Sequence, residues 1–336
     1  MNKKIKNILN MLLLTLVTII VLYISLKDNF YDVIMGLTKI NVFWIIIALI
    51  FVFGYSYLRS LSLYNFVKKF KNDIRFTKIL KITFITQFFD GITPSSTGGQ
   101  PYQLYALTKE EIKLTDATNI VIQNFIVYQI ALILLGFVAV ISNNYLNLFK
   151  DLGTIKKLII LGFIINVIVI IGLFSLAFMK KLNKIIGKIL VKVLSKLKII
   201  KNKEKVLNSM NEYIDRFHDG ARILLKDKIN FIKMILINLL SLMLLYTVPA
   251  ILIFGLGDYT SINVYYAIIT STYVMLIGSF IPIPGASGGL EYAFTKFYGT
   301  FITGSTLTLI MLLWRTLTYY LGIIIGGILL NIRKKR

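Results

Sequence analysis

The chain has no cysteine, which excludes disulfide bridges, thiolate metal sites and cysteine catalysis. Its single histidine, His218, falls in a stretch that we interpret as a solvated loop, so no histidine-based catalytic or metal site is expected. Charged residues are scarce, at 16% against about 25% in soluble domains, while 57% of residues are hydrophobic. Together with a mean hydropathy of +0.76, this excludes a soluble globular protein and predicts an integral membrane protein.

Acidic residues are the rarer charged class, with 15 Asp and Glu against 38 Lys and Arg, for a formal net charge of +23. A strongly basic chain can bind nucleic acid, but here the basic residues lie in the loops between apolar segments. We therefore expect the bilayer, with its anionic surface, as the partner and no nucleic acid. The sequence contains no nucleotide-binding motif or metal-ligand spacing, so neither a cofactor nor a metal is expected.

Several apolar runs are long enough for a membrane-spanning helix, which needs about 20 residues. The predicted spans are Ile8–Ser25, Val42–Leu58, Thr118–Ile141, Leu158–Met179, Asn230–Leu256 and Ser305–Leu330. The first of these follows a basic N-terminus, as in a signal peptide, but it is too long and lacks a cleavage site, so we expect a retained helix. Two further runs, Arg75–Phe89 and Asn263–Ile283, each lead into a segment rich in proline and glycine.

Basic loops mark the cytoplasmic side of a membrane protein. The assigned cytoplasmic segments are the two termini, Arg59–Lys81 and Lys180–Asn230, and the outer ones are Lys27–Asn41, Ser142–Lys157 and Gly255–Asn263. Each crossing helix changes the side of the membrane, and the six predicted spans already account for every change of side between these segments. Phe76–Lys113 must therefore enter and leave from the cytoplasm, and Asn263–Gly304 from outside. We predict an all-α membrane bundle, a single domain over residues 1–336, with six crossing helices and two re-entrant hairpins.

The predicted cytosolic loop, residues 180–229, has apolar residues at helical spacing with lysines on the opposite face. The apolar positions are Leu182, Ile185, Ile186, Ile189, Leu190, Val193, Leu194 and Leu197. This pattern predicts a basic amphipathic helix lying on an anionic leaflet. A second, similar pattern follows it, at Val206, Met210, Tyr213, Phe217 and Leu224. We interpret both as surface helices that set the topology.

A nine-residue motif, Pro-x-x-x-Gly-Gly-x-x-Tyr, occurs twice, from Pro94 to Tyr102 and from Pro284 to Tyr292. Proline and paired glycines break a helix, and broken backbone at membrane depth is tolerated only inside protein or beside a wet cavity. Two breaks that enter from opposite faces are typical of the inverted repeats of transporters. The alternative is a pair of tight turns between helices. The second motif also contains the hydrolase pattern Gly-x-Ser-x-Gly, which we reject because no partner histidine accompanies it.

Ionisable and polar residues in apolar segments are costly and therefore candidate functional residues. Two ion pairs are possible, Glu291 with Arg315 and Asp90 with Arg59. For Glu291 and Arg315, structural pairing and head-group binding both remain open, and for Arg59 the favoured interpretation is a basic anchor at the cytoplasmic end of its helix. The candidate head-group-binding residues are Asp90, Pro94, Gly98, Gly99, Gln100, Tyr102, Pro284, Gly285, Gly288, Gly289, Glu291 and Arg315. Secondary candidates are Arg59, Gln123 and Asn124, and no residue is assigned a catalytic role. Gly322-x-x-x-Gly326 predicts close packing against another helix.

Three features resemble one known family: Thr93-Pro94 followed by Gly98-Gly99-Gln100-Pro101, Pro282-Ile-Pro284 with Glu291, and Arg315 in the last span. They are similar to the transmembrane region of lysylphosphatidylglycerol synthases, which is the flippase domain of the multiple peptide resistance factor and of stand-alone relatives. The resemblance implies a multi-pass protein of the bacterial inner membrane, connected with antibiotic resistance and lipid metabolism. The chain departs from the family pattern at Gln123 and Asn124, where relatives often carry an arginine and an acid.

The resemblance also implies an activity: movement of a phospholipid, such as aminoacylated phosphatidylglycerol, between leaflets. Two-domain relatives carry a C-terminal acyltransferase domain. The present chain ends shortly after its last predicted span, so we expect neither that soluble domain nor phosphatidylglycerol lysyltransferase activity. Arg315 and the half-helix starts near Gly98 and Gly288 are expected to meet the lipid phosphate, and Asp90 and Glu291 a cationic group. Without a nucleotide motif, transport would be downhill or ion-coupled.

Two other functions remain open. One is a membrane-embedded transferase of lipid metabolism, for which Asp90 and Glu291 are the only well-placed acids. The other is a membrane subunit that anchors a separate lipid-modifying enzyme through the basic loop Lys180–Lys228.

Overall fold

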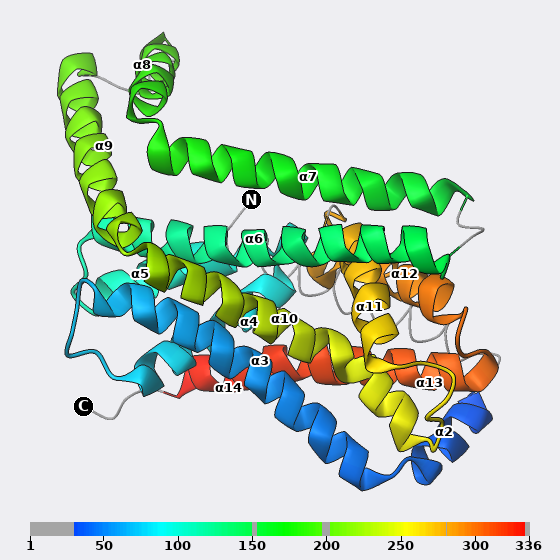
Figure 1. The fold of residues 1–336 in the computed structure, drawn as a ribbon. Coiled ribbons are helices and arrows are strands. Elements are labelled where there is room, and N and C mark those ends of the chain that lie inside the picture. Colours follow the sequence, from blue (N-terminus) through cyan, green and yellow to red (C-terminus); the bar gives the residue numbers. More distant parts are fainter. Residues whose placement is uncertain (1–29, 150–152, 197–201, 280, 333–336) are drawn as a thin grey trace.

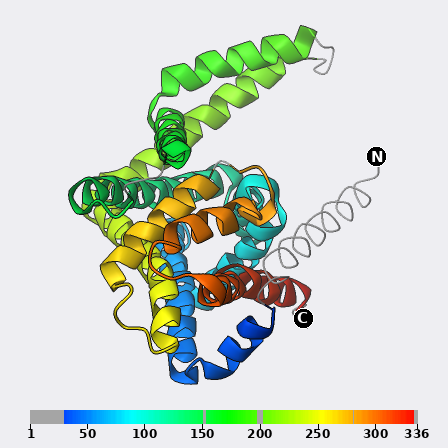
Figure 2. The same ribbon diagram turned by 90° about the vertical axis from the view of Figure 1, so that its right-hand side faces the viewer.

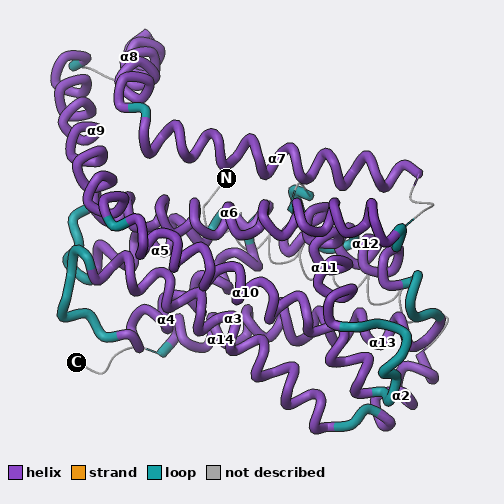
Figure 3. Tube along the Cα trace, viewed as in Figure 1, coloured by secondary structure: helices purple, strands orange, loops and turns teal. Residues whose placement is uncertain are grey.

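The computed structural model describes residues 30–149, 153–196, 202–279 and 281–332, and all regular structure in these residues is helical (Figure 3). The helices that run the length of the molecule are α3 (Val42–Lys68), α6 (Leu114–Leu146), α7 (Gly153–Phe178), α10 (Lys228–Gly255) and the continuous segment α13–η3–α14 (Gly304–Arg315, Thr316–Tyr320, Leu321–Asn331). Each is long and apolar enough to cross a membrane, which confirms the predicted bundle. The remaining predicted span, Ile8–Ser25, lies outside the described residues.

The predicted cytoplasmic segments that the structure describes lie together at one end of the bundle, on the left of Figure 1. Lys81 at this end donates to the carbonyl of Ile332 (3.2 Å), which places the start of α4 (Phe76–Ile92) beside the end of α14. We call this the basic end. The predicted outer segments lie at the opposite end, where Ser142 and Tyr265 share a hydrogen bond of 2.5 Å.

Two helical hairpins fill the space between the long helices. The first is α4, η1 (Pro94–Ser96) and α5 (Gly99–Lys109), and the second is α11 (Val264–Gly278), η2 (Pro284–Ala286) and α12 (Gly289–Tyr298). A helix of 15 residues such as α11 extends about 22 Å, less than the hydrocarbon thickness of about 30 Å. The first hairpin starts and ends at the basic end, the second at the opposite end, and their turns η1 and η2 contact each other inside the bundle.

The two turns share one feature of backbone conformation. In each motif the two residues after the proline adopt positive φ angles: 52° and 51° at Ser95 and Ser96, and 61° and 50° at Gly285 and Ala286. Such angles end a right-handed helix and reverse the chain, and for serine and alanine they are uncommon. The repeated sequence motif therefore produces a repeated structure, as the inverted-repeat interpretation predicted.

The last span packs tightly against the first hairpin. The α carbon of Gly322 faces the side chain of Gln87, and that of Gly326 faces the backbone carbonyl of Phe84 so closely that a β carbon would collide with it. This confirms the predicted packing face and names its partner, α4, which is held directly against α14.

Helices α8 (Lys180–Lys196) and α9 (Lys203–Lys226) form an antiparallel pair that lies across the direction of the spans at the basic end (Figures 1 and 2). Asp215 joins them through Lys180 (2.9 Å) and Lys184 (2.7 Å), and these hydrogen bonds, that of Lys184 first, lower the pKa of Asp215. The exposed apolar side chains of α8 are Leu182, Ile185, Ile186, Ile189, Leu190 and Val193. The predicted amphipathic helix is confirmed.

Two details at the ends of the bundle differ from the sequence-based expectation. His218, expected to be solvated, is 5% exposed and its Nε2 lies 3.0 Å from the amide nitrogen of Asn183. Its ring is enclosed because α9 packs on the start of α8. At the opposite end, the predicted loop Lys27–Asn41 contains a helix, α2 (Phe30–Lys39), which packs on α13 through Gly36 and Leu309.

Candidate functional site

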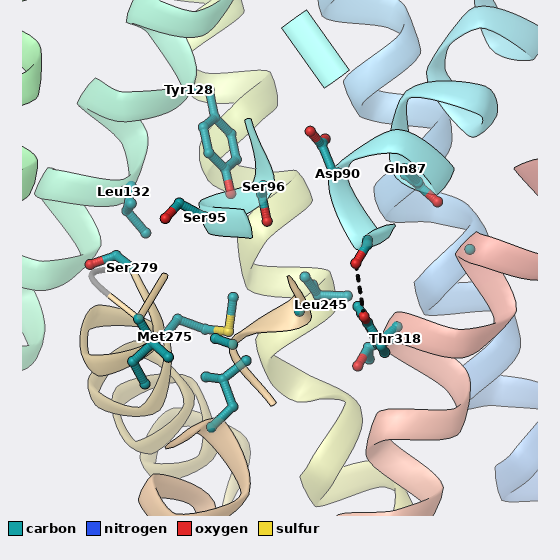
Figure 4. A pocket seen from close by; sticks show the side chains of 18 of the residues that line it. Gln87, Asp90, Ser95, Ser96, Tyr128, Leu132, Leu245, Met275, Ser279 and Thr318 are labelled. Carbon is teal, nitrogen blue, oxygen red and sulfur yellow. Dashed lines mark hydrogen bonds between the residues drawn. The ribbon is translucent and has the colours of Figure 1, made fainter. Parts of the chain in front are cut away.

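A cavity of about 490 Å³ lies where the two hairpin turns meet (Figure 4). It is about halfway along the spans, because Tyr128 and Leu132 at the middle of α6 and Thr318 at the middle of the last span line it. Its polar lining consists of Arg59, Gln87, Asp90, Ser95, Ser96, Gln100, Gln129, Asn166, Ser271, Ser279, Arg315, Thr318 and four tyrosines, Tyr55, Tyr128, Tyr246 and Tyr319. These polar groups, together with apolar side chains such as Leu132, Leu245 and Met275, thus surround a cavity at mid-depth of the bundle.

In the first turn, Asp90 binds the start of the helix that follows. Its Oδ1 accepts from the backbone N–H of Gly99 (2.9 Å), and the hydroxyl of Thr93 accepts from that of Gly98 (2.8 Å). No lysine or arginine nitrogen of the described residues lies within 4.0 Å of the Asp90 carboxylate, so the expected ion pair with Arg59 does not form. The carboxylate instead neutralises the positive end of α5, and both Asp90 and Arg59 face the cavity.

In the second turn, the carboxylate at the helix start comes from the other side of the break, because Glu291 lies in the first turn of α12 itself. Its Oε2 accepts from the backbone N–H of Gly288 (2.7 Å), at the start of α12, and its Oε1 lies 2.7 Å from Nε of Arg315. The side chains of this pair are almost fully buried, with 7% of Glu291 and 4% of Arg315 exposed. The expected Glu291–Arg315 ion pair is therefore present. Both half-helix starts, expected to be open to a phosphate, carry carboxylates of the chain itself.

The last span ties the two turns together through its π-helical segment η3. Nη2 of Arg315 donates to the carbonyl of Gly285 in the second turn (3.0 Å), and the hydroxyl of Tyr319 donates to the carbonyl of Gly91 beside the first (2.9 Å). The guanidinium of Arg315 also lies 4.3 Å from the centre of the Tyr319 ring. Residues 315 and 319, four apart, lie on the same side of the helix, and the π turn between them is of a kind that often marks functional sites. Tyr319 was not among the residues expected from the sequence.

Arg59 is held at the cavity by uncharged groups. Its guanidinium lies 3.9 Å from the centre of the Tyr128 ring, and Nη1 donates to Oδ1 of Asn238 (3.4 Å). Asn238 is fully buried and also donates to Ser62 (2.9 Å). Within the described part of the chain, Arg59 has no acidic partner, so its charge is available to an anion in the cavity. No pattern in the sequence separates Tyr128 or Asn238 from the other residues of their spans.

The other predicted residues divide into those that line the cavities and those that build the turns. Gln100 and Gly285 line the main cavity, and Asn124 lines a smaller one of about 30 Å³ beside it. The residues that shape the turns without lining the main cavity are Pro94, Gly98, Gly99, Tyr102, Pro284, Gly288 and Gly289. Tyr102 stacks on Phe89, with ring centres 4.9 Å apart. Gln123 is 0% exposed, lines neither cavity, and its amide has no partner among the described residues.

The cavity contains groups that can bind a charged ligand. Asp90 is the one carboxylate that lines either cavity in the described ranges, and no cluster of three metal-ligating side chains occurs in them. Arginine and amide donors recognise phosphate oxygens, and hydroxyl groups recognise the polar remainder of a head group. The arrangement can therefore hold a charged, oxygen-rich group in the middle of the bundle.

Comparison with known proteins agrees with this geometry. The profile of the family described as "Lysylphosphatidylglycerol synthase TM region" matches residues 10–326. The chain is also similar to an archaeal "UPF0104 membrane protein" from Archaeoglobus fulgidus, with 26% identity over 273 residues, which cover 77% of this chain and 76% of that protein. The family match extends over both hairpins and the last span.

Proposed function

Because this chain belongs to the lysylphosphatidylglycerol synthase TM region family of membrane proteins, we propose that it translocates a phospholipid between the leaflets of a bacterial inner membrane. The observation that carries this proposal is the cavity between two broken hairpins, which holds charged and polar side chains halfway across a bundle with an apolar exterior. A polar head group crosses a bilayer slowly because its transfer into hydrocarbon costs free energy. A polar chamber at mid-depth lowers that cost while the acyl chains remain in lipid.

In the proposed pathway the head-group phosphate binds Arg59, and the amides of Gln100 and Gln129 bind its oxygens. Asp90 faces the same space and would lie beside the ammonium of an aminoacylated lipid. Arg315 faces the cavity as well, but its guanidinium already contacts Glu291, Gly285 and Tyr319. We therefore propose that Arg315 holds the two turns in place and does not bind the lipid. The substrate class is an anionic phospholipid, with or without an aminoacyl group.

Arg59→Ala is expected to slow lipid exchange about tenfold, because a charge-assisted hydrogen bond to phosphate contributes about 1.5–3 kcal/mol. The measurement uses purified protein in liposomes with fluorescent phosphatidylglycerol or lysyl-phosphatidylglycerol, and an impermeant quencher reports the outer leaflet. The control is Arg216→Ala, because Arg216 is exposed on α9 and pairs only with Glu212 of the same helix among the described residues. If the wild-type protein accelerates exchange of neither lipid, the transport proposal is wrong.

We further propose that the basic end faces the cytoplasm, following the excess of lysine and arginine there. Since the chain has no cysteine, single-cysteine variants test this without background labelling. In intact cells an impermeant maleimide should label Tyr145→Cys, at an 83% exposed position of the opposite end, and leave Lys205→Cys, on α9, unlabelled until the cells are permeabilised. The reverse pattern would show the opposite orientation.

A further inference from the structure

The two hairpins differ in how their acidic residues are neutralised. Glu291 contacts a guanidinium at 2.7 Å and a backbone N–H, and it is almost fully buried. Asp90 accepts a hydrogen bond from the N–H of Gly99 but contacts no guanidinium group in the described residues. It lines both the main cavity and the smaller one. Glu291 of the second hairpin is therefore held in an ion pair, and Asp90 of the first hairpin is accessible from two cavities.

The smaller cavity lies beside Asp90 and has polar side chains in its walls. Its volume of about 30 Å³ is enough for about two water molecules. Its walls include Thr83, Thr86, Gln103 and Asn124, whose side chains can hydrogen-bond water. Thr83 precedes Asp90 by about two helical turns, or about 10 Å toward the basic end. Water in this cavity would extend the polar contact of Asp90 in the direction of the basic end.

The other ionisable residues that line the two cavities, within the described part of the chain, are all tyrosines or arginines. They are Arg59 and Tyr55 on α3, Tyr128 on α6, Tyr246 on α10, Arg315 on α13 and Tyr319 on η3. Tyrosines are neutral near pH 7 and arginines remain charged, so neither residue type exchanges protons there. Asp90 is thus the group lining the described cavities that can change charge when a ligand arrives.

We infer that Asp90 is a proton-binding site coupled to head-group binding, an inference that rests on the proposed lipid transport. An anionic head group bound at Arg59 would share the cavity with the negative carboxylate of Asp90, at the positive end of α5. A proton on Asp90 removes this repulsion. By linkage, proton binding and phosphate binding then strengthen each other, and one coupled proton changes the affinity by up to about tenfold per pH unit. A lipid that brings its own ammonium would replace the proton.

The test is exchange of fluorescent phosphatidylglycerol by the full chain in liposomes at pH 6, 7 and 8. We expect the rate to rise as the pH falls. Asp90→Asn preserves the acceptor for the Gly99 N–H but carries no charge, so it should show no pH dependence. Asp215→Asn is the matched control, because Asp215 lies on the α8–α9 surface pair and pairs with Lys180 and Lys184. This variant should keep the dependence of the wild type.

The outcomes separate the two proposals. Exchange that is accelerated equally at all three pH values, or a pH dependence that survives in Asp90→Asn, would overturn the proton site and leave lipid transport intact. Absence of exchange at every pH would overturn both. If Asp90→Asn fails to fold, the affinity of the wild-type protein in detergent for a short-chain phosphatidylglycerol at pH 6, 7 and 8 gives an independent reading. An affinity that rises as the pH falls supports the proton site, and an affinity that is the same at all three pH values contradicts it.

Discussion

Arg315→Ala is expected to cause the largest loss of stability of any single substitution in the bundle. It leaves the Glu291 carboxylate buried without a counter-ion and removes the donor to the Gly285 carbonyl. Breaking one partner of a buried ion pair costs about 3–5 kcal/mol, because the remaining charge cannot reach water. The variant should therefore melt at a markedly lower temperature in detergent than the wild-type protein, and it should lose lipid exchange.

The double variant Glu291→Gln with Arg315→Met tests whether the loss of stability in Arg315→Ala comes from the unpaired Glu291 carboxylate. It should recover part of the stability lost in Arg315→Ala, since no unpaired ion remains in the interior. Arg59→Ala is the matched comparison, because Arg59 lines the same cavity without an acidic partner in the described chain. We expect it to lower exchange with little change in melting temperature. Normal stability in Arg315→Ala would contradict the structural role assigned to this pair.

Much of this arrangement was predictable because it depends on local sequence. Apolar runs of sufficient length predicted the spans, and basic loops predicted which of their ends lie together, since both signals are read one segment at a time. The hairpin turns were predictable because proline and paired glycines break a helix wherever they occur. The Glu291–Arg315 pair followed because an acid and a base in two apolar segments have few other partners.

What could not be predicted depends on side-chain direction across helices. Asp90 and Arg59 have complementary charges, yet Asp90 turns toward the Gly99 amide and Arg59 toward the Tyr128 ring. Both choices depend on the rotation of α3 and α4 about their axes, which composition does not set. The π turn at Thr316–Tyr320 was also missed, because one extra residue in a helical turn leaves no mark on hydropathy. Tyr319 was missed as well, because its contacts with Gly91 and Arg315 join different segments of the chain.

Gly285→Ala is expected to disrupt the meeting point of the two turns, with an effect second only to that of Arg315→Ala. Gly285 has a φ of +61°, a conformation that costs a residue with a β carbon about 1–2 kcal/mol. That β carbon would also collide with the ring of Tyr319, and overpacking of this kind adds about 1–3 kcal/mol. The ring would have to move, and its hydroxyl would leave the carbonyl of Gly91. Both melting temperature and lipid exchange should fall.

Gly257→Ala separates these two contributions. Gly257 has a φ of +83°, but nothing lies within 4 Å of the place where its β carbon would stand, so this control carries backbone strain without a collision. The larger loss in Gly285→Ala therefore measures the contact with Tyr319. Adding Tyr319→Leu to Gly285→Ala should restore part of the stability, because the two effects are coupled through one contact. Equal losses in Gly257→Ala and Gly285→Ala would mean that Tyr319 does not hold the two turns together, and the pathway through their junction would lose its structural basis.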